Sequence, residues 1–373
     1  MKGYRFMKNS FGNNITVTLF GESHGEAIGC VIDGLAPGIV IDEAAIDAAL
    51  AQRRGEASIS TARREGDAVS FLSGVKDGVT EGTPVCLVIK NECAKRDDYS
   101  ALAATPRPSH ADYAAECKYH GYQDASGGGH FSGRLTAPIV AAGAIIAGAL
   151  KERGIYIGTH VLSLGGVRDR DFSDLCKDIE ALDGRAFPVL DEAAALRMRA
   201  AIAEARAEGD SIGGVLECAV IGMPEGVGEP WFDTVEGLLA HAYLSIPAVK
   251  GVEFGRGFAL ADMRGSEAND ELYFDTDGTV KTKTNNCGGV CGGITNGMPI
   301  TARIAIKPTP SIARQMETVD LKSGENITLT VGGRHDGAIA HRACPAVTAM
   351  TAIVLADLLV TRFGTDWLGG KRG

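Results

Sequence analysis

Long apolar runs, surplus positive charge and a secretion signal are all missing from this sequence. The uncharged run Leu135–Leu150 has 16 residues and is rich in Ala and Gly, whereas a membrane-spanning helix needs about 20 strongly apolar residues. The first 20 residues contain no apolar core of a secretory signal. The formal net charge is −10, and acidic chains bind nucleic acid or anionic membranes poorly. We therefore expect a cytoplasmic protein with neither nucleic acid nor membrane among its partners.

The sequence also lacks the cysteine pattern of a disulfide framework or a zinc site. Its nine cysteines are scattered and odd in number, which is typical of reduced thiols. Cys287 and Cys291 lie close together, but a zinc ribbon needs two such pairs, so we expect no metal. Aromatic residues are scarce at 6%, whereas glycine is abundant at 49 of 373 residues. This glycine content, about 13% against a usual ~7%, predicts many tight turns.

Three motifs occur twice, in the same order, along the chain. For example, the segments Gly74–Val85 and Gly289–Ile300 both read G-V-x-x-G-[V/I]-T-x-G-x-P-[V/I]. An ordered set of repeated motifs indicates an internal duplication, with halves at about 10–150 and 205–360 and a helical insertion at about 151–208. The three pairs are Gly21–Gly38 with Gly209–Gly226, Gly74–Val85 with Gly289–Ile300, and Gly128–Leu150 with Gly332–Asp357.

Alternating apolar and polar residues predict strands, and capping residues predict where helices begin. Because consecutive strands with turn connections are followed by helices, we expect an α+β fold in which antiparallel sheets are sandwiched with outer helices. No Pro- or Ser-rich linker separates the halves, so residues 1–373 should form a single large domain with a site between the halves. The predicted strands are Asn14–Phe20, Val85–Lys90, Val215–Ile221, Pro299–Lys307 and Ile327–Val331, and helices are expected to start at Asp42, Asp191 and Asp233.

The segment Gly21–Gly25 (GESHG) follows a predicted strand and fits G-x-S-x-G, the nucleophile turn of serine hydrolases. Ser23 would then be a nucleophile, yet the next residues do not predict the helix that this motif requires. A turn-stabilising hydroxyl is the alternative for Ser23. His24 corresponds to Ile212 in the second half. The turn therefore does not need a histidine, and His24 has a purpose beyond the fold.

His110 lies between Arg107 and Asp112 in a loop stiffened by Pro106 and Pro108. This setting suits an acid–base histidine beside an anionic substrate. A surface histidine in a proline turn is the alternative.

Two glycine-rich loops, 127–134 and 332–336, each precede a predicted helix. Backbone N–H groups in such loops favour anions, although the first could be a plain turn and Asp336 in the second could be a helix cap. The segment Lys307–Ser311 (KPTPS) ends a strand and offers polar groups to a ligand. Paired arginines suggest a cationic pocket for phosphate or carboxylate, or else solvated helix ends. These pairs are Arg53 with Arg54 and Arg63 with Arg64.

Taken in order, these motifs resemble those of the chorismate synthase family over nearly the whole chain. The resemblance extends from NNITVTLFGESHG to the last predicted helix. Each motif alone is weakly specific, but eleven in the right order are very specific. They are DGLAPG, RRE, FLSGV, RPSHADY, GGGHFSGR, GDSIGG, GEPWFD, IPAVKGVEFG, the glycines at 288–293, KPTPS and GRHD.

The resemblance implies a carbon–oxygen lyase of the shikimate pathway, which serves aromatic amino acid biosynthesis. Such an enzyme eliminates phosphate from 5-enolpyruvylshikimate-3-phosphate in a 1,4-elimination and gives chorismate. It requires reduced FMN, although the reaction has no net oxidation. The substrate carries two carboxylates and a phosphate, so its site needs several arginines and a protonated histidine.

The resemblance also implies roles for individual residues. His24 would act as the acid toward the leaving phosphate, and His110 would protonate the reduced flavin near N1. Asp336 would work with flavin N5 in removing the C6 hydrogen. The residues implied to bind substrate or NADP are Arg53, Arg107 and Arg134, and those implied to line the FMN are His130, Ser132, Ala248, Gly292, Lys307, Pro308, Thr309, Pro310, Ser311 and Arg334.

The resemblance further implies a homotetramer, with NADPH as an indirect source of reducing equivalents. No nicotinamide motif or additional domain is visible, so we expect an external flavin reductase. A second arginine that the family pattern has a few residues after Arg53 is missing, and Ser58 or Ile59 stands there. Beside the serine hydrolase, an inactive flavin-binding scaffold is an alternative. The sequence also departs from the usual family pattern at His130, Phe131, Pro247 and Asn286.

Overall fold

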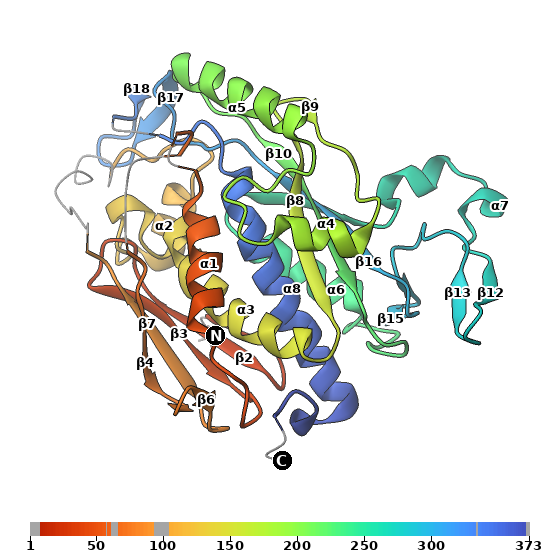
Figure 1. Cartoon of the computed structure of the whole chain (residues 1–373). Coiled ribbons are helices and arrows are strands. Elements are labelled where there is room, and N and C mark those ends of the chain that lie inside the picture. The colour runs from red at the N-terminus through yellow and green to blue at the C-terminus, as the bar shows by residue number, and fades with distance from the viewer. Residues whose placement is uncertain (1–7, 57, 61–65, 93–103, 333–334, 371–373) are drawn as a thin grey trace, which may run out of the picture.

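The computed structural model of the chain describes residues 8–56, 58–60, 66–92, 104–332 and 335–370. Two five-stranded antiparallel sheets form its framework (Figure 1). In spatial order, the first sheet contains β1 (Ser10–Phe11), β2 (Thr16–Gly21), β3 (Ala27–Asp33), β7 (Val85–Lys90) and β4 (Val69–Ser73). The second contains β11 (Val249–Phe254), β16 (Ile300–Ile306), β10 (Gly214–Ile221), β8 (Tyr156–Leu164) and β9 (Val167–Arg168).

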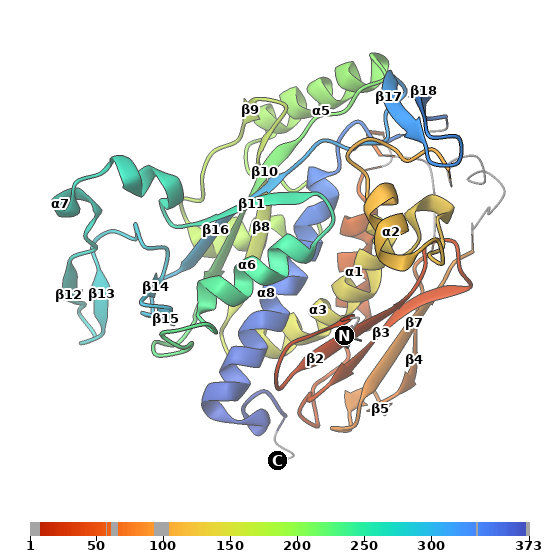
Figure 2. The same ribbon diagram turned by 180° about the vertical axis from the view of Figure 1, so that it is seen from behind.

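Two apolar helices, α3 (Thr136–Lys151) and α8 (Ala340–Phe363), lie between the sheets (Figures 1 and 2). Helix α3 contacts β3 and β7 of the first sheet and β8 of the second, while α8 packs along α3 and against β8 and β10. A Cβ atom added at Gly143 would lie 2.2 Å from Cβ of Ala349. The two helices therefore meet through small side chains, which explains the Ala- and Gly-rich composition of α3.

The expected α+β class and the antiparallel sheets packed against helices are confirmed, but the two longest apolar helices lie inside the sandwich. Helix α4 (Leu175–Leu182) does lie on the outside, as expected. It packs on β8 and β10, the same strands that α8 contacts from within the sandwich. Figure 2 shows α5 and α2 at the periphery. The other helices are α1 (Glu43–Arg54), α2 (Asp112–Tyr119), α5 (Glu192–Ala207), α6 (Val235–Ser245) and α7 (Gly265–Ala268).

Among the described residues, two helices are long and apolar enough to span a membrane, and both lie in the core. Residues Gly133–Lys151 and Ala340–Phe363 are long and apolar enough to cross a bilayer, yet 67% and 89% of their most apolar windows are buried inside the protein. Their hydrophobicity is explained by their position between two sheets.

The two sheets have the same strand order when their strands are matched through the repeated sequence motifs. The order β2-β3-β7-β4 in the first sheet corresponds to β8-β10-β16-β11 in the second. The repeated motifs give β3 the counterpart β10, and β7 the counterpart β16. A common strand order is what an internal duplication would produce, and the proposed limits of its halves stay a prediction.

The expectation of a purely helical insertion over about 151–208 is wrong for its first part, because β8 occupies residues 156–164. This strand takes the place in the second sheet that β2 takes in the first. Its residues are buried almost continuously, because helices cover both of its faces. A strand buried on both faces shows no alternation of polar and apolar residues, so the pattern that predicts strands was absent.

The predicted strand and helix boundaries agree closely with the structure elsewhere. Predicted strand Val85–Lys90 coincides with β7. Asp42 and Asp191 cap α1 and α5, each accepting a backbone N–H at 3.0 Å. Helix α6 is the exception, since its cap is Thr234 rather than Asp233.

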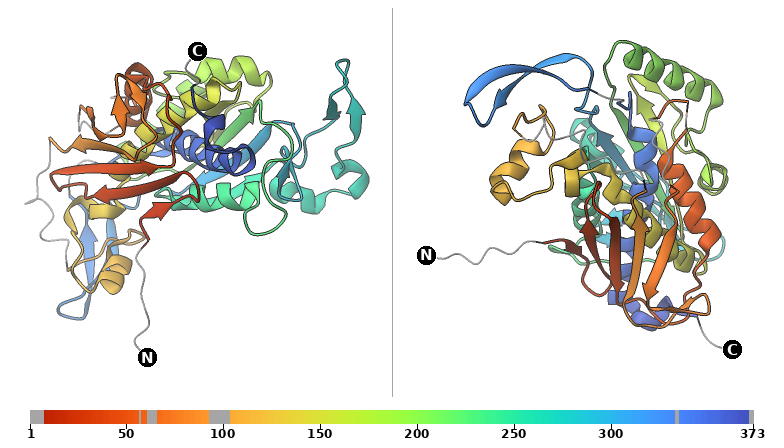
Figure 3. Two further views of the ribbon diagram at one scale, coloured as in Figure 1. Left: turned by 90° about the horizontal axis from the view of Figure 1, so that it is seen from below. Right: turned by 90° about the vertical axis from the view of Figure 1, so that its left-hand side faces the viewer.

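The remaining strands form two-stranded hairpins at the surface. The hairpin β12–β13 and helix α7 project from the body as an arm (Figure 3). The four hairpins are β5 (Val75–Lys76) with β6 (Val79–Thr80), β12 (Leu272–Phe274) with β13 (Val280–Thr282), β14 (Val290–Cys291) with β15 (Ile294–Thr295), and β17 (Gln315–Asp320) with β18 (Glu325–Thr330). Short 3₁₀ helices span Ser126–Phe131, Gly133–Leu135, Gly257–Asp262 and Thr365–Trp367.

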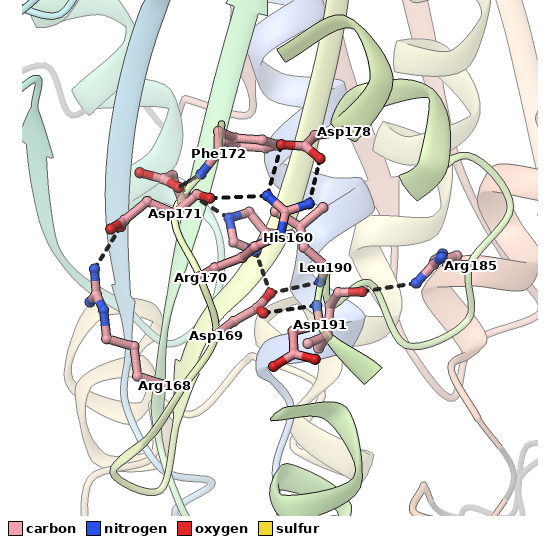
Figure 4. Close-up of polar contacts among 12 residues, drawn as sticks. His160, Arg168, Asp169, Arg170, Asp171, Phe172, Asp178, Arg185, Leu190 and Asp191 are labelled. Atoms are coloured by element: carbon pink, nitrogen blue, oxygen red, sulfur yellow. Dashed lines mark hydrogen bonds and ion pairs between the residues drawn. The ribbon is translucent and has the colours of Figure 1, made fainter. Parts of the chain in front are cut away.

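A fully buried histidine ties β8 to the segments that follow it (Figure 4). Nδ1 of His160 lies 3.1 Å from Asp169 and Nε2 lies 3.1 Å from Glu217. Asp169 also accepts the backbone N–H groups of Leu190 and Asp191 at 2.7 and 3.0 Å. Burial alone would lower the pKa of His160, but the hydrogen bonds to the two carboxylates outweigh it and raise the pKa.

This arrangement predicts a loss of stability as the pH rises. A raised pKa in the folded state means that folding is stabilised fully below the ordinary histidine pKa of about 6.5 and less at higher pH. The urea midpoint should therefore fall between pH 6 and 9 in the natural protein, and His160→Gln should flatten that dependence. His241→Gln, at an exposed histidine, is the control and should leave the slope unchanged. A flat profile in the natural protein would contradict the prediction.

Candidate functional site

The turn between β2 and β3 carries Ser23 and His24 at its centre. Gly25 N donates to Glu22 O at 3.1 Å and closes the turn. Both central side chains are buried, with 0% and 5% exposed. Because strand β3 rather than a helix follows, this turn is not the strand–turn–helix elbow of serine hydrolases. The fold thus removes the basis for Ser23 as a nucleophile.

Ser23 and His24 contact each other and the first glycine loop. Ser23 Oγ lies 3.0 Å from His24 Nδ1 and 3.2 Å from Ser126 O. A hydroxyl group has one hydrogen, so when Ser23 donates it to the Ser126 carbonyl, His24 Nδ1 donates to Ser23 Oγ. In this tautomer, Nε2 of His24 is the nitrogen that gains and loses a proton.

The loop formed by Gly127, Gly128 and Gly129 lies between His24 and His110. All three glycines have positive φ, at 59°, 90° and 52°. A Cβ atom at Gly127 would lie 2.0 Å from His24 Cε1, and one at Gly128 would lie 3.2 Å from His110 Cε1. The absence of side chains here lets both imidazoles approach the same stretch of backbone. The structure therefore brings the two predicted catalytic histidines to one loop.

His110 is held by an ionic cluster immediately before α2. Its Nδ1 lies 2.5 Å from Asp112 Oδ1, and Arg107 donates to Asp112 at 2.8 and 2.9 Å. Burial alone would raise the pKa of Asp112, but the hydrogen bonds from Arg107 and His110 outweigh it and hold that pKa well below its usual range. Because Asp112 engages Nδ1, Nε2 of His110 faces the glycine loop, in the manner of an oriented acid–base histidine.

The segment Lys307–Ser311 approaches the same cluster from the end of β16. Arg107 Nη1 donates to Ser311 Oγ at 3.2 Å, and Lys307 Nζ donates to the carbonyl oxygen of Ser109. Thr309 Oγ1 is buried and has no hydrogen-bond partner among the residues that the structure describes. A buried hydroxyl without a partner is costly, and it marks this segment as a place where a polar ligand group would fit.

Arg134 follows the glycine loop and forms a second ionic cluster. Its Nη1 pairs with Asp67, which lies 3.5 Å from Arg54 Nη1, and its Nε donates to Asn91 Oδ1 at 3.1 Å. Both Arg134 and Asp67 are buried. Asp67 also has a positive φ of 54°, which is unusual for a residue other than glycine and costs about 1–3 kcal/mol.

Arg53 connects this second cluster to the start of α8. Its side chain is 4% exposed, and Nη2 donates to Arg134 O at 3.4 Å. Arg342 Nε donates to Arg53 O at 3.2 Å, and Arg342 Nη1 donates to Asp336 at 2.6 Å. Burial lowers the pKa of Arg53 to about 9, so it is still cationic at neutral pH. Its Nε has no hydrogen-bond partner within the described part of the chain.

An apolar cavity of about 290 Å³ adjoins the glycine loop. His130 and Ser132 line it, and His130 Nδ1 donates to Gly21 O at 2.8 Å. Pro247 also lines it and precedes Ala248, whose φ of 74° is positive and whose carbonyl oxygen accepts Lys307 N–H at 2.9 Å. Its apolar walls include Phe11, Val17, Leu19, Leu135, Ile139 and Met350.

One residue predicted from the sequence, Gly292, is not brought into this site. Gly292 lies in the turn of β14–β15, which Figures 1 and 2 place on the side of the molecule away from α2. Arg334 and the pair Arg63 and Arg64 lie outside the described residues.

Three residues that the sequence did not single out also belong to the site: Asp67, Asn91 and Arg342. Each supports a predicted residue rather than standing in a recognisable motif. Asn91 directly follows β7 and Asp67 precedes β4, so both reach Arg134 only because neighbouring strands end at one edge of the sheet. An asparagine directly after a predicted strand was the one available signal.

Among the residues that the structure describes, cationic side chains outnumber carboxylates in the two clusters. They contain six cationic side chains, on Arg53, Arg54, Arg107, Arg134, Lys307 and Arg342, and three carboxylates, on Asp67, Asp112 and Asp336. This local surplus contrasts with the net charge of −10 for the chain. The arrangement suits a ligand with several negative charges.

Comparison with known proteins gives one consistent result. The family model for chorismate synthase matches residues 15–360. A chorismate synthase from Thermococcus gammatolerans is 46% identical over 94% of this chain and 97% of its own length. One from Aeropyrum pernix is 46% identical over 95% and 93%. A crystal structure of chorismate synthase has a TM-score of 0.76 at 29% identity, covering 95% of this chain and 94% of that one.

The contact between Gly127 and His24 predicts that a methyl group at this position disrupts the site. Gly127→Ala should bring Cβ into steric overlap with the imidazole ring of His24. It should also place a residue other than glycine at a positive φ, so we expect about 2 kcal/mol or more of destabilisation. Gly133→Ala is the matched control, because a Cβ there meets no atom within 4 Å. Urea midpoints and the NMR shifts of the His24 ring measure the effect. Equal behaviour of the two variants would refute the tight contact.

Proposed function

This chain belongs to the chorismate synthase family, and we propose that its reaction takes place where the glycine loop holds His24 beside His110. The protein converts 5-enolpyruvylshikimate-3-phosphate to chorismate in the shikimate pathway, which supplies aromatic amino acid biosynthesis. It is a lyase. The observation that carries the site assignment is the pair of histidines on one loop, flanked by surplus cations.

The buried arginines supply the binding energy for the substrate anions. Arg53 and Arg134 lie together, and Arg53 Nε has no hydrogen-bond partner among the described residues. A carboxylate or phosphate oxygen would satisfy this buried donor. Arg107 is already engaged by Asp112, so we assign it mainly to orienting His110 and only secondarily to substrate.

His24 is the residue that we propose to protonate the leaving phosphate. Its Nδ1 is held by Ser23, and its ring lies against Gly127. Nε2 can therefore present a proton in a fixed direction. Because the C–O bond to phosphate breaks during the reaction, a positioned proton donor stabilises the negative charge that develops on the leaving oxygen.

His110 and Asp336 serve the other end of the reaction. Asp112 and Arg107 orient His110 so that its Nε2 carries the exchangeable proton toward the bound ligands. Asp336 is the carboxylate that we assign to loss of the C6 hydrogen, and Arg342 fixes its direction through a 2.6 Å hydrogen bond. A cap role for Asp336 is not supported, because the helix cap of α8 is Ile339.

Reduced FMN is the cofactor that the family generally uses, and the residues present fit it. Thr309 Oγ1 is a buried hydroxyl without a partner in the described chain, and Lys307 lies in the same segment. The apolar cavity between His130, Ser132 and Pro247 has walls suited to a flat ring system. When bound, reduced FMN supplies electron density for the breaking C–O bond. The segment Lys307–Ser311, Ser132, His130 and Ala248 would hold it.

Further features of the family are proposals for this chain. We propose a cytoplasmic homotetramer in which NADPH serves only indirectly, through an external flavin reductase. In such a tetramer, we propose that Gly292 lies at a neighbouring subunit's site, since the structure does not bring it to its own. No nucleic acid or membrane enters this proposal.

The first functional prediction concerns the flavin. Under anaerobic conditions, dithionite-reduced FMN should support many turnovers per flavin, followed by chorismate absorbance and phosphate release, because the elimination has no net redox change. FMN binding without substrate is measured separately by flavin fluorescence. Oxidation of one flavin per chorismate formed would contradict the catalytic role.

The second functional prediction separates His24 from the fold. His24→Ala should reduce kcat by at least ~100-fold, since a positioned acid contributes about 10²–10⁴-fold. Ile212→Ala changes the equivalent position of the second half, which is half-buried. It should lower the urea midpoint and leave kcat per folded molecule close to that of the natural protein. An unstable His24→Ala with normal kcat per folded molecule would show that His24 is structural.

A further inference from the structure

Asn91 connects the turn that carries His24 to Arg134 through a single carboxamide. Its Nδ2 group donates to Glu22 O and to Gly25 O, both at 3.0 Å. These are the carbonyls at the first and last positions of the turn, which Gly25 N closes by donating to Glu22 O. On its other side, Asn91 Oδ1 accepts Arg134 Nε at 3.1 Å.

The backbone of Asn91 is fixed independently of its side chain. Asn91 follows the last residue of β7, and its N–H donates to Glu26 O at 3.0 Å, continuing the pairing of β3 with β7. The carboxamide therefore projects from a sheet edge whose backbone position is fixed. Its two N–H hydrogens and its oxygen are all used in these three contacts.

Only a carboxamide of this length can make all three contacts. Aspartate has the same shape but no N–H group, so it would keep the Arg134 contact and place negative charge against two carbonyl oxygens. Alanine would lose the hydrogen bonds to the turn and also the hydrogen bond from Arg134. The pair of substitutions therefore separates the turn contact from the arginine contact.

We propose that Asn91 is a positioning residue for the elimination, which fixes the direction of His24 by clamping both ends of the turn Glu22–Gly25. This inference rests on the proposed role of His24 as the acid toward the leaving phosphate. Asn91 does not contact substrate itself; it acts through the turn. Through Arg134, it also sets the distance between that turn and a cation assigned to substrate binding.

The experiment measures kcat, KM and pH–rate profiles with dithionite-reduced FMN for Asn91→Asp, Asn91→Ala, His24→Ala and the double variant His24→Ala/Asn91→Asp. Asn14→Asp is the control, because it makes the same charge change at the opposite end of β2, where Asn14 donates to Thr361 Oγ1 at 2.7 Å. Urea midpoints and FMN titration by fluorescence give the folded fraction. A crystal structure of Asn91→Asp reports the position of the turn directly.

We expect Asn91→Asp and Asn91→Ala each to lower kcat about 10-fold or more, with a smaller change in KM for Asn91→Asp. In the His24→Ala background, Asn91→Asp should cause no further loss, because residues that act through one group are not additive. The control should keep its kcat. The turn should be displaced in the Asn91→Asp crystal structure.

Other outcomes overturn the inference in distinguishable ways. Normal kcat in Asn91→Asp with a slow Asn91→Ala would mean that the carboxamide serves Arg134 alone. Additive losses in the double variant would mean that Asn91 does not act through His24. If His24→Ala itself turns over normally, the proposed function of His24 fails. If His24→Ala is slow while Asn91→Asp is not, only the role of Asn91 fails.

Discussion

The contact between α3 and α8 is the constraint on which the site depends. These helices meet at Gly143 and Ala349, where there is no room for an additional methyl group. Each helix begins directly after a loop that carries site residues, so their packing fixes where those loops lie. Arg53 then links the two helix starts, since it donates to Arg134 O and accepts from Arg342. A shift of one helix would separate Asp336 from the arginines.

Much of this arrangement was predictable, and the remainder shows what a sequence pattern omits. Strand β7 and the caps of α1 and α5 follow from local rules of alternation and capping, which depend on neighbouring residues only. Strand β8 did not follow, because burial on both faces erases alternation. Asp67 and Asn91 were not predicted as site residues for a different reason. They belong to the site because both contact Arg134 at a sheet edge, and residues so far apart in the sequence give no local pattern that indicates such a contact.

The charge distribution explains how an acidic protein can hold a highly anionic substrate. The chain has a net charge of −10, whereas the described residues of the site include six cationic side chains and three carboxylates. Burying Arg53 is unfavourable, as the lowering of its pKa to about 9 shows. The fold offsets this cost only partly, through Arg134 O and the field of Asp67. We therefore expect an anion bound at the Arg53 guanidinium to recover part of the free energy lost on burying this cation.

The two histidines illustrate how one loop can support two kinds of proton chemistry. His24 has a neutral hydroxyl as its partner, while His110 has the carboxylate of Asp112 backed by Arg107. Ser23 and Asp112 both engage Nδ1 of a histidine, so Nε2 of each ring is the nitrogen that gains and loses a proton. Both rings lie against adjacent glycines, so one loop fixes the place of the two groups that we propose to transfer protons.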